Sequence, residues 1–192
     1  MTTVIEPELV RRAAAGDRAA TSALLAEVRP GLVRYCRARL GRIGGAYATA
    51  DDVAQEVCLA VLRALPRYRD QGSPFAAFVY GIAAHKVADA QRAAVRDSAV
   101  TPTDAPLEQP DAAPGPEQQA VATDLARRLS VLLKQLPETQ REIILLRVAV
   151  GLTADEVGVI VGMTAAAVRM AQSRALVRLR TLAGDALDEV AA

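Results

Sequence analysis

The sequence predicts an all-α protein with two small helical domains joined by an acidic, proline-rich linker, the second containing a helix-turn-helix. Three observations support this. Alanine is abundant, while aromatic residues make up only 3% of the 192 residues, and such a composition favours helices over sheet. Apolar residues recur at helical spacing on both sides of the proline-rich stretch. Residues 153–180 carry the caps and the glycine turn of two successive helices.

Two helices are expected near the N-terminus. The first covers about residues 8–15 and ends at Gly16, and the second covers residues 18–40. Pro30 lies inside the second helix with Gly31 beside it. A bend or break is expected there, because proline removes a backbone donor and its ring clashes with the preceding turn.

A third helix is predicted over residues 49–65, after a glycine-rich turn. Thr49 or Asp51 can cap it, and Pro66 ends it. One side of this helix is apolar. The other side is mixed, and it could be merely solvated or could contact another protein; it carries Asp52, Gln55, Glu56, Leu59 and Arg63.

A loop over residues 68–74 precedes a long fourth helix. Gly72 permits a positive φ angle, and Asp70 can bond nearby backbone. The helix opens with an aromatic and apolar set and then becomes basic, a combination expected of a protein that stacks unpaired bases and contacts their backbone. The alternative is that one or two of the aromatic residues are simply core. The aromatic residues are Phe75, Phe78 and Tyr80, and the basic ones are His85, Lys86, Arg92 and Arg96.

Charge and proline divide the chain into three parts. Residues 1–96 hold 14 Lys/Arg and 9 Asp/Glu, residues 97–124 hold none and 6, and residues 125–192 hold 9 and 7, giving net charges of +5, −6 and +2. Five of the ten prolines lie in the acidic part, which has few large apolar residues. We therefore expect domains over residues 1–96 and 119–192, joined by a flexible linker over 97–118.

The second domain is expected to hold two helices, over residues 118–136 and 139–150, before the helix-turn-helix. Thr153 and Glu156 have the spacing of a capping box at the start of a short amphipathic helix, which Gly162 ends. A turn of about three residues then leads to Thr164, the cap of the next helix. A plain helical hairpin is the alternative.

The helix after Thr164 should run for about four turns to Arg180. One side is apolar, the rest carries four arginines and small side chains, and no acidic residue lies between these bounds. Such a face suits a DNA groove, because arginines neutralise phosphates and small residues allow close approach. An ordinary basic surface helix is the alternative. The apolar side comprises Val168, Ala171, Ala175, Leu176 and Leu179.

Other classes of function are not favoured. Cys36 and Cys58 form no CxxC pattern and His85 is the only histidine, so no disulfide, metal site or cofactor is expected, and the cysteines are expected to be small buried thiols. No catalytic constellation is recognisable, so we expect no enzyme. No apolar run approaches the roughly 20 residues that span a membrane, and no signal peptide is recognisable, so a cytoplasmic location is expected.

Taken together, the segments resemble the extracytoplasmic-function (ECF) sigma factors, the small bacterial initiation factors of RNA polymerase, and among them the actinobacterial SigD-like group. The resemblance covers nearly the whole chain and rests on the order and spacing of four segments. These are DDVAQEV from Asp51, PRYRDQGSPFAAFVYGIAAHKVAD from Pro66, LPETQREIILLRVAVGLTADEVGVIVG from Leu136, and AVRMAQSRALVRLR from Ala167.

The resemblance implies three sets of contacts and a factor that directs promoter-specific initiation. Duplex DNA of the minus-thirty-five element would be met by Thr164, Arg169, Met170, Ser173, Arg174 and Arg178. The unpaired minus-ten strand would be met by Tyr68, Asp70, Gly72, Phe75, Phe78, His85, Lys86 and Arg92. The clamp helices of the large subunit of core polymerase would be met by Asp52, Gln55, Glu56 and Leu59.

The chain departs from the family pattern at three positions. Phe78 replaces a frequent tryptophan, His85 a frequent asparagine, and Ala171 a frequent arginine. The resemblance therefore does not predict which promoter sequence the protein recognises. An anti-sigma factor is a typical partner of the family. The alternative function is a stand-alone helix-turn-helix regulator that binds duplex DNA without polymerase.

Overall fold

The computed structural model describes residues 5–41, 50–70, 72–98 and 128–191, and these ranges contain helices and turns but no strand. Residues 128–134 are also helical. The helices are α1 (Pro7–Ala14), α2 (Arg18–Leu40), α3 (Ala50–Ala64), the 3-10 turn η1 (Leu65–Arg67), α4 (Phe75–Ser98), α6 (Glu138–Ile144), the π-helix η2 (Leu145–Val150), α7 (Ala154–Val161) and α8 (Ala165–Ala191). The all-α prediction is confirmed.

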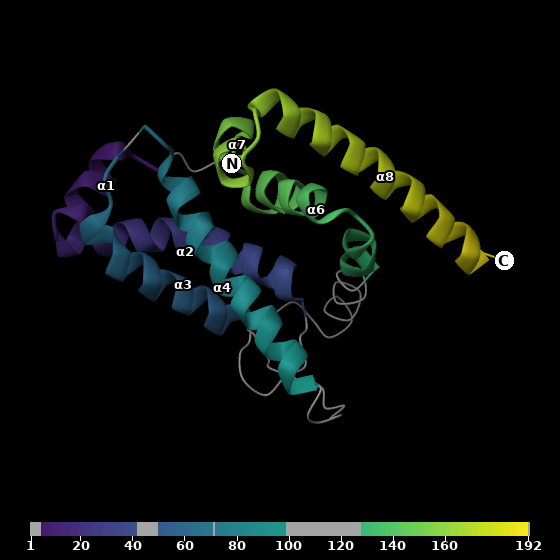
Figure 1. The fold of residues 1–192 in the computed structure, drawn as a ribbon, viewed down its shortest axis with the longest axis horizontal. Helices are drawn as coiled ribbons and strands as arrows, with labels where there is room; N and C mark the ends of the chain where they lie inside the picture. Colours follow the sequence, from purple (N-terminus) through teal and green to yellow (C-terminus); the bar gives the residue numbers. More distant parts are fainter. Residues whose placement is uncertain (1–4, 42–49, 71, 99–127, 192) are drawn as a thin grey trace, which may run out of the picture.

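The helices form two groups that pack against each other. Helices α1 to α4 form an N-terminal region, and α6 to α8 form a C-terminal region in which α6 lies between α8 and the N-terminal helices (Figure 1). Buried residues of both regions belong to one apolar cluster, which runs from Leu24 and Leu32 through Val57 and Val79 to Leu146. The two regions therefore share part of their core.

The N-terminal helices follow their predicted bounds with two differences. Helix α2 runs without a break through Pro30, which is exposed, while its neighbour Gly31 is buried. The helix continues because apolar positions on both sides of the proline, such as Leu24 and Leu32, are fully buried. Helix α3 begins at Ala50, so Asp51 is its second residue and not its cap; Thr49 lies outside the described residues.

The segment after Pro137 was predicted as one helix but changes type. It is α-helical to Ile144 and then becomes the π-helix η2, which ends at Gly151 with φ of 95°. Four consecutive residues, 143–146, are all buried. Ile143 and Leu146 belong to the core shared with the N-terminal region, while the two residues between them pack in a second cluster with Ala175 of α8. A helix in contact on both sides buries all four.

The remaining expectations concern the cysteines, α8 and the linker. Both cysteines are free thiols; Cys36 is buried, as predicted, whereas Cys58 is only half-buried. Burial raises the pKa of Cys36 to about 12.

Helix α8 continues to Ala191, well beyond the four turns expected. Helix α4 extends to Ser98, and the rest of the predicted linker lies outside the described residues.

Candidate nucleic-acid interface

The turn between α7 and α8 has the predicted caps. Thr153 Oγ1 accepts a hydrogen bond from the Glu156 backbone amide at 3.2 Å, and the Glu156 carboxylate accepts one from the Thr153 amide at 2.7 Å. Gly162 ends α7 with φ of 68°. Thr164 Oγ1 then accepts from the Ala167 amide at 3.2 Å. Each of these bonds satisfies a donor at a helix start, so local chemistry fixes both helices.

A close backbone approach fixes the angle of the turn. Gly158 is buried in α7, and a Cβ atom there would lie 2.5 Å from the carbonyl oxygen of Met163. Only glycine allows that approach. The Met163 amide also donates to the Gly158 carbonyl at 2.8 Å. The turn therefore requires glycine at position 158, which the capping pattern in the sequence did not identify.

Arg147 joins three segments of the C-terminal region. Its Nε donates to the side-chain oxygen of Gln172 on α8 at 3.0 Å, and its Nη1 donates to the carbonyl of Leu152. The side chain thus connects η2, the turn before α7 and α8. The local sequence pattern does not reveal this role of Arg147, because its bond to Gln172 joins positions 25 residues apart.

Helix α8 presents two faces. Val168 and Ala175 are fully buried, and the other apolar positions of the predicted face are half-buried. The opposite face is exposed, with Met170 56% exposed. Arg169 lies 4.0 Å from Asp155, but both side chains are largely exposed, so this pair is weak. The predicted duplex contacts gathered on the exposed face are Thr164, Arg169, Met170, Ser173, Arg174 and Arg178.

In the loop at residues 68–74, the described residues are held by a side-chain to backbone hydrogen bond and by aromatic packing. Asp70 Oδ1 accepts from the Gly72 amide at 3.0 Å, and Gly72 has φ of 78°, as predicted. The ring of Tyr68 lies 5.3 Å from that of Phe75 and 5.0 Å from that of Phe78. Phe75 is buried, so in this structure it supports the loop and does not offer a ring face; Phe78 and Tyr68 are half-buried.

This loop borders a cavity between the two regions. The cavity has a volume of about 1230 Å³ and is lined by α1, α2, the loop and the start of α4 on one side. Residues 148–152 and Glu156 of the C-terminal region line the other side. Part of the surface predicted for unpaired DNA, the part around residues 68–75, therefore faces the other half of the protein.

The basic part of α4 adjoins the predicted polymerase-binding side of α3. Lys86 Nζ donates to the Glu56 carboxylate at 3.0 Å, while His85 is exposed and Arg92 pairs with Asp89 on its own helix. On α3 the exposed residues include all four predicted contacts, Asp52, Gln55, Glu56 and Leu59. Within the described residues no cluster of metal-binding side chains occurs, and none of the described helices is long and apolar enough to cross a membrane.

Comparison with known proteins matches both regions to one family. Residues 24–97 match Sigma-70 region 2 and residues 132–181 match Sigma-70 region 4. The chain is 56% identical to the ECF RNA polymerase sigma factor ShbA of Streptomyces griseus over 95% of this chain and 96% of that protein. It is also 56% identical to the ECF RNA polymerase sigma factor SigD of Mycobacterium tuberculosis, over 90% of this chain and 81% of SigD.

The chain belongs to the ECF sigma factors. Its function is that of an RNA polymerase sigma factor, which confirms both the resemblance and the function inferred from the order of the four segments. The solved structure of CnrH in complex with the cytosolic domain of CnrY has a similar fold, with a TM-score of 0.67 and 24% identity, and the match covers 93% of this chain and 96% of that one.

Within the sigma factor, the structure brings most predicted residues together in their expected sets. The duplex set lies on one face of α8, and the polymerase set lies on one side of α3. The minus-ten set is divided: Tyr68, Asp70, Gly72 and Phe75 line the cavity, whereas His85, Lys86 and Arg92 lie farther along α4. The roles of these residues stay predictions.

Proposed function

We propose that this sigma factor directs initiation by recognising two promoter elements with two separate surfaces. The outer face of α8 contacts duplex DNA at the minus-thirty-five element. The observation that carries this proposal is the two-sided α8, in which buried Val168 and Ala175 fix the helix while Arg169, Ser173 and Arg174 project from its other side. Arginine can bond guanine edges and phosphates in the major groove, and the neighbouring small residues permit close approach.

The second surface is the loop at residues 68–74 with α4, which contacts the unpaired minus-ten strand. The half-buried rings of Tyr68 and Phe78 stand beside the loop, and His85 is exposed further along the helix. Stacking of a captured base contributes about 1 to 3 kcal/mol, which offsets part of the cost of melting. Phe75 supports these rings from below through its contacts with both.

Core polymerase binds the exposed side of α3. This side combines the acidic residues Asp52 and Glu56 with Leu59, which is 44% exposed although it is large and apolar. A single exposed leucine is common on protein surfaces, so the assignment of this side to the polymerase rests on the family resemblance of α3. The clamp helices of the large subunit are the expected partner, and the factor acts through the polymerase and is not itself a catalyst.

Two further parts of the proposal concern the organisation of the chain. Domains over residues 1–96 and 119–192 are tethered by residues 97–118, so binding of one domain raises the effective concentration of the other at its own element. An anti-sigma factor is the expected regulatory partner, as is typical of the family.

Run-off transcription with core polymerase and genomic fragments tests the function. We expect new start sites that depend on the added protein. Tight binding to duplex DNA without any new start site would instead favour a stand-alone helix-turn-helix regulator.

A pair of variants on one helix tests the duplex surface. Arg174→Ala should weaken binding to minus-thirty-five duplex about tenfold and lower the slope of log affinity against log salt by about 1, because one phosphate or base contact is lost. Arg180→Ala, at the far end of the predicted face, is the matched control and should have a much smaller effect. Equal losses for both variants would contradict the assignment of the contact residues.

A further inference from the structure

A polar residue interrupts the packed side of α8. Gln172 lies on the same side of the helix as Val168 and Ala175, because residues three and four apart share a face, and both of these neighbours are fully buried. Gln172 is itself half-buried. A polar group on a packed face needs a hydrogen-bond partner. The partner here is Arg147 of η2, whose Nε donates to Gln172 Oε1 at 3.0 Å.

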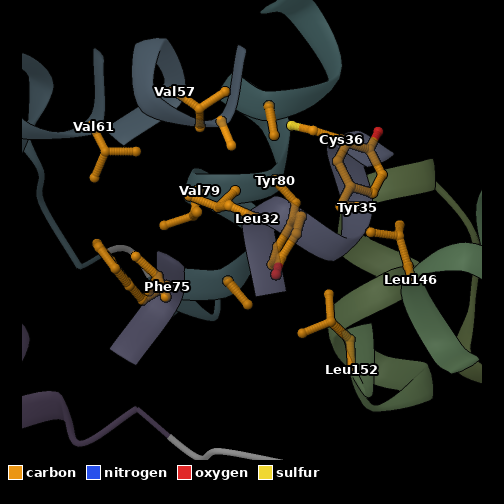
Figure 2. Close-up of a cluster of buried hydrophobic side chains, with 14 of the residues drawn as sticks. Leu32, Tyr35, Cys36, Val57, Val61, Phe75, Val79, Tyr80, Leu146 and Leu152 are labelled. Carbon is orange, nitrogen blue, oxygen red and sulfur yellow. The ribbon is translucent and has the colours of Figure 1, made fainter. Parts of the chain in front are cut away.

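The core holds Arg147 in place at both ends of its side chain. Arg147 directly follows Leu146, and its Nη1 donates to the backbone carbonyl of Leu152. Figure 2 shows Leu146 and Leu152 among the buried side chains of one apolar cluster. A guanidinium is planar and its donors have fixed directions, so two bonds made at once determine its orientation. The bond to Gln172 therefore joins α8 to a group that is itself fixed.

The other contacts of α8 fix its rotation less well. Val168, Ala171 and Ala175 pack on the core with small side chains, and the attraction between apolar surfaces has no direction. The ion pair between Arg169 and Asp155 is largely exposed and 4.0 Å long, so it adds little. A hydrogen bond, in contrast, requires its donor and acceptor to align within roughly 30°. The Arg147 bond gives the packed side of α8 a defined direction.

Rotation of α8 decides which base edges its exposed residues reach. Arg169 and Ser173 are exposed and lie about 60° and 100° around the helix axis from Gln172. A helix with its side chains has a radius of about 5 to 6 Å, so a rotation of about 20° moves its outer atoms by about 2 Å. Hydrogen bonds tolerate a range of only about 0.5 Å. Such a rotation would change the bases that are read, whereas phosphate contacts carry no sequence information.

We propose that Arg147 is a positioning residue for promoter recognition, which fixes the rotation of α8 through Gln172 and so sets which sequences the exposed face discriminates. Both residues are half-buried and lie outside that exposed face. The inference rests on the proposed binding of α8 to the minus-thirty-five duplex. The residues that touch DNA supply affinity, and the pair of Arg147 and Gln172 determines how sharply that affinity depends on sequence.

Two single substitutions remove the bond from opposite sides. Gln172→Met keeps the length of the side chain but has no strong acceptor, and Arg147→Lys keeps the charge but has no fork that can bond two partners. Gln172→Glu is the rescue variant, because a carboxylate accepts a stronger bond from Arg147. Gln140→Met is the matched control. It makes the same change at another half-buried glutamine of the C-terminal region, whose side-chain oxygen accepts no hydrogen bond from the described residues.

The experiment uses the full-length factor with core polymerase. The templates are one promoter found with genomic fragments, randomised at its minus-thirty-five element and carrying a transcribed barcode, and the transcripts are sequenced. Discrimination is the ratio of transcript from the preferred element to transcript from its single-base variants. Gln172→Met and Arg147→Lys should each lower this ratio about three- to tenfold, as expected for one lost hydrogen bond. The double variant should lose no more than either single variant.

The rescue and control variants separate positioning from a general effect on the fold. Gln172→Glu and Gln140→Met should keep the wild-type ratio, since repulsion between the new carboxylate and phosphates acts on all elements alike. Thermal unfolding of each variant is measured in parallel. If Arg147 only stabilised the fold, Gln172→Met and Arg147→Lys would lower transcript from every element equally at an unchanged ratio, and this result would overturn the proposal. An equal loss of discrimination in Gln140→Met would overturn it as well.

Failure of this inference differs from failure of the proposed function. A wild type that transcribes all randomised elements equally would reject recognition of the minus-thirty-five element, and the positioning role with it. A wild type that discriminates, with Gln172→Met and Arg147→Lys discriminating as well, would retain that recognition and reject only the role of Arg147.

Discussion

The outer face of α8 and the loop at residues 68–74 are both proposed to contact promoter DNA, but they have different surroundings. On α8 the packing residues and the contact residues lie on opposite sides, so the face is complete and exposed. Next to the loop, Phe75 at the start of α4 is buried and packs against the ring of Phe78, beside a cavity that the C-terminal region also lines. The proposed duplex-binding face is therefore preformed, whereas the proposed strand-binding surface is divided between the rim of this cavity and the exposed part of α4.

The largest effect on stability is expected for substitutions at two adjacent leucines, Leu145 and Leu146. Leu146 packs in the core shared by both regions and Leu145 in the cluster beneath α8. Leu146→Ala and Leu145→Ala should each cost about 2 to 5 kcal/mol of stability, because each creates a cavity. Hydrogen exchange should distinguish them: Leu146→Ala should speed exchange in α2, and Leu145→Ala in α8. The same exchange pattern in both variants would contradict the division of the core.

A second test concerns the preformed surface alone. Gly158→Ala should destabilise the C-terminal region by about 1 to 3 kcal/mol, because its methyl group would collide with the Met163 carbonyl. Gly184→Ala on α8 is the matched control; its Cβ atom would meet nothing within 4 Å, and it should stabilise the helix by about 0.5 to 1 kcal/mol. Denaturant unfolding measures both. A neutral Gly158→Ala would show that the turn can relax.

The capping box provides a smaller test. Thr153→Ala should cost about 1 kcal/mol, since the Glu156 amide loses its acceptor at the start of α7. Thr153→Ser keeps the hydroxyl and should recover most of the loss. Thermal unfolding monitored together with duplex binding checks whether the effect stays within the helix-turn-helix; weaker polymerase binding without weaker duplex binding would contradict that.

The smallest effect is expected at an exposed ion pair of the N-terminal region. Hydrogen bonding from Arg37 lowers the pKa of Asp51, but both side chains are about half exposed, so the pair contributes at most about 0.5 kcal/mol. Because the folded pKa is lowered, this contribution is present above about pH 4 and disappears as the pH falls through the folded value. The stability difference between wild type and Asp51→Asn should therefore shrink on acidification from pH 6 to pH 2. A difference that grows would contradict this sign.

Local features of the fold could be predicted from the sequence, and contacts between distant segments could not. The capping residues Thr153 and Thr164 and the two faces of α8 depend on neighbours within a few positions. The bond between Tyr35 and Glu142 joins positions 107 residues apart, and neither periodicity nor capping chemistry carries such information. One signal was present: four consecutive large apolar residues, 143–146, cannot all face one side of a helix. Gly31 was a second signal, because a glycine inside a predicted helix usually has a packing reason.

Residues 143–146 also have a consequence for how the sequence can vary. The outer two side chains of this short segment belong to the shared core and the inner two to the cluster beneath α8, so one substitution affects both the folding of the C-terminal region and its attachment to α2. Mutations there are pleiotropic. Among homologues, changes in volume within this segment should covary with changes on α2 and α8 together, and adaptation of promoter recognition should instead accumulate on the exposed face of α8.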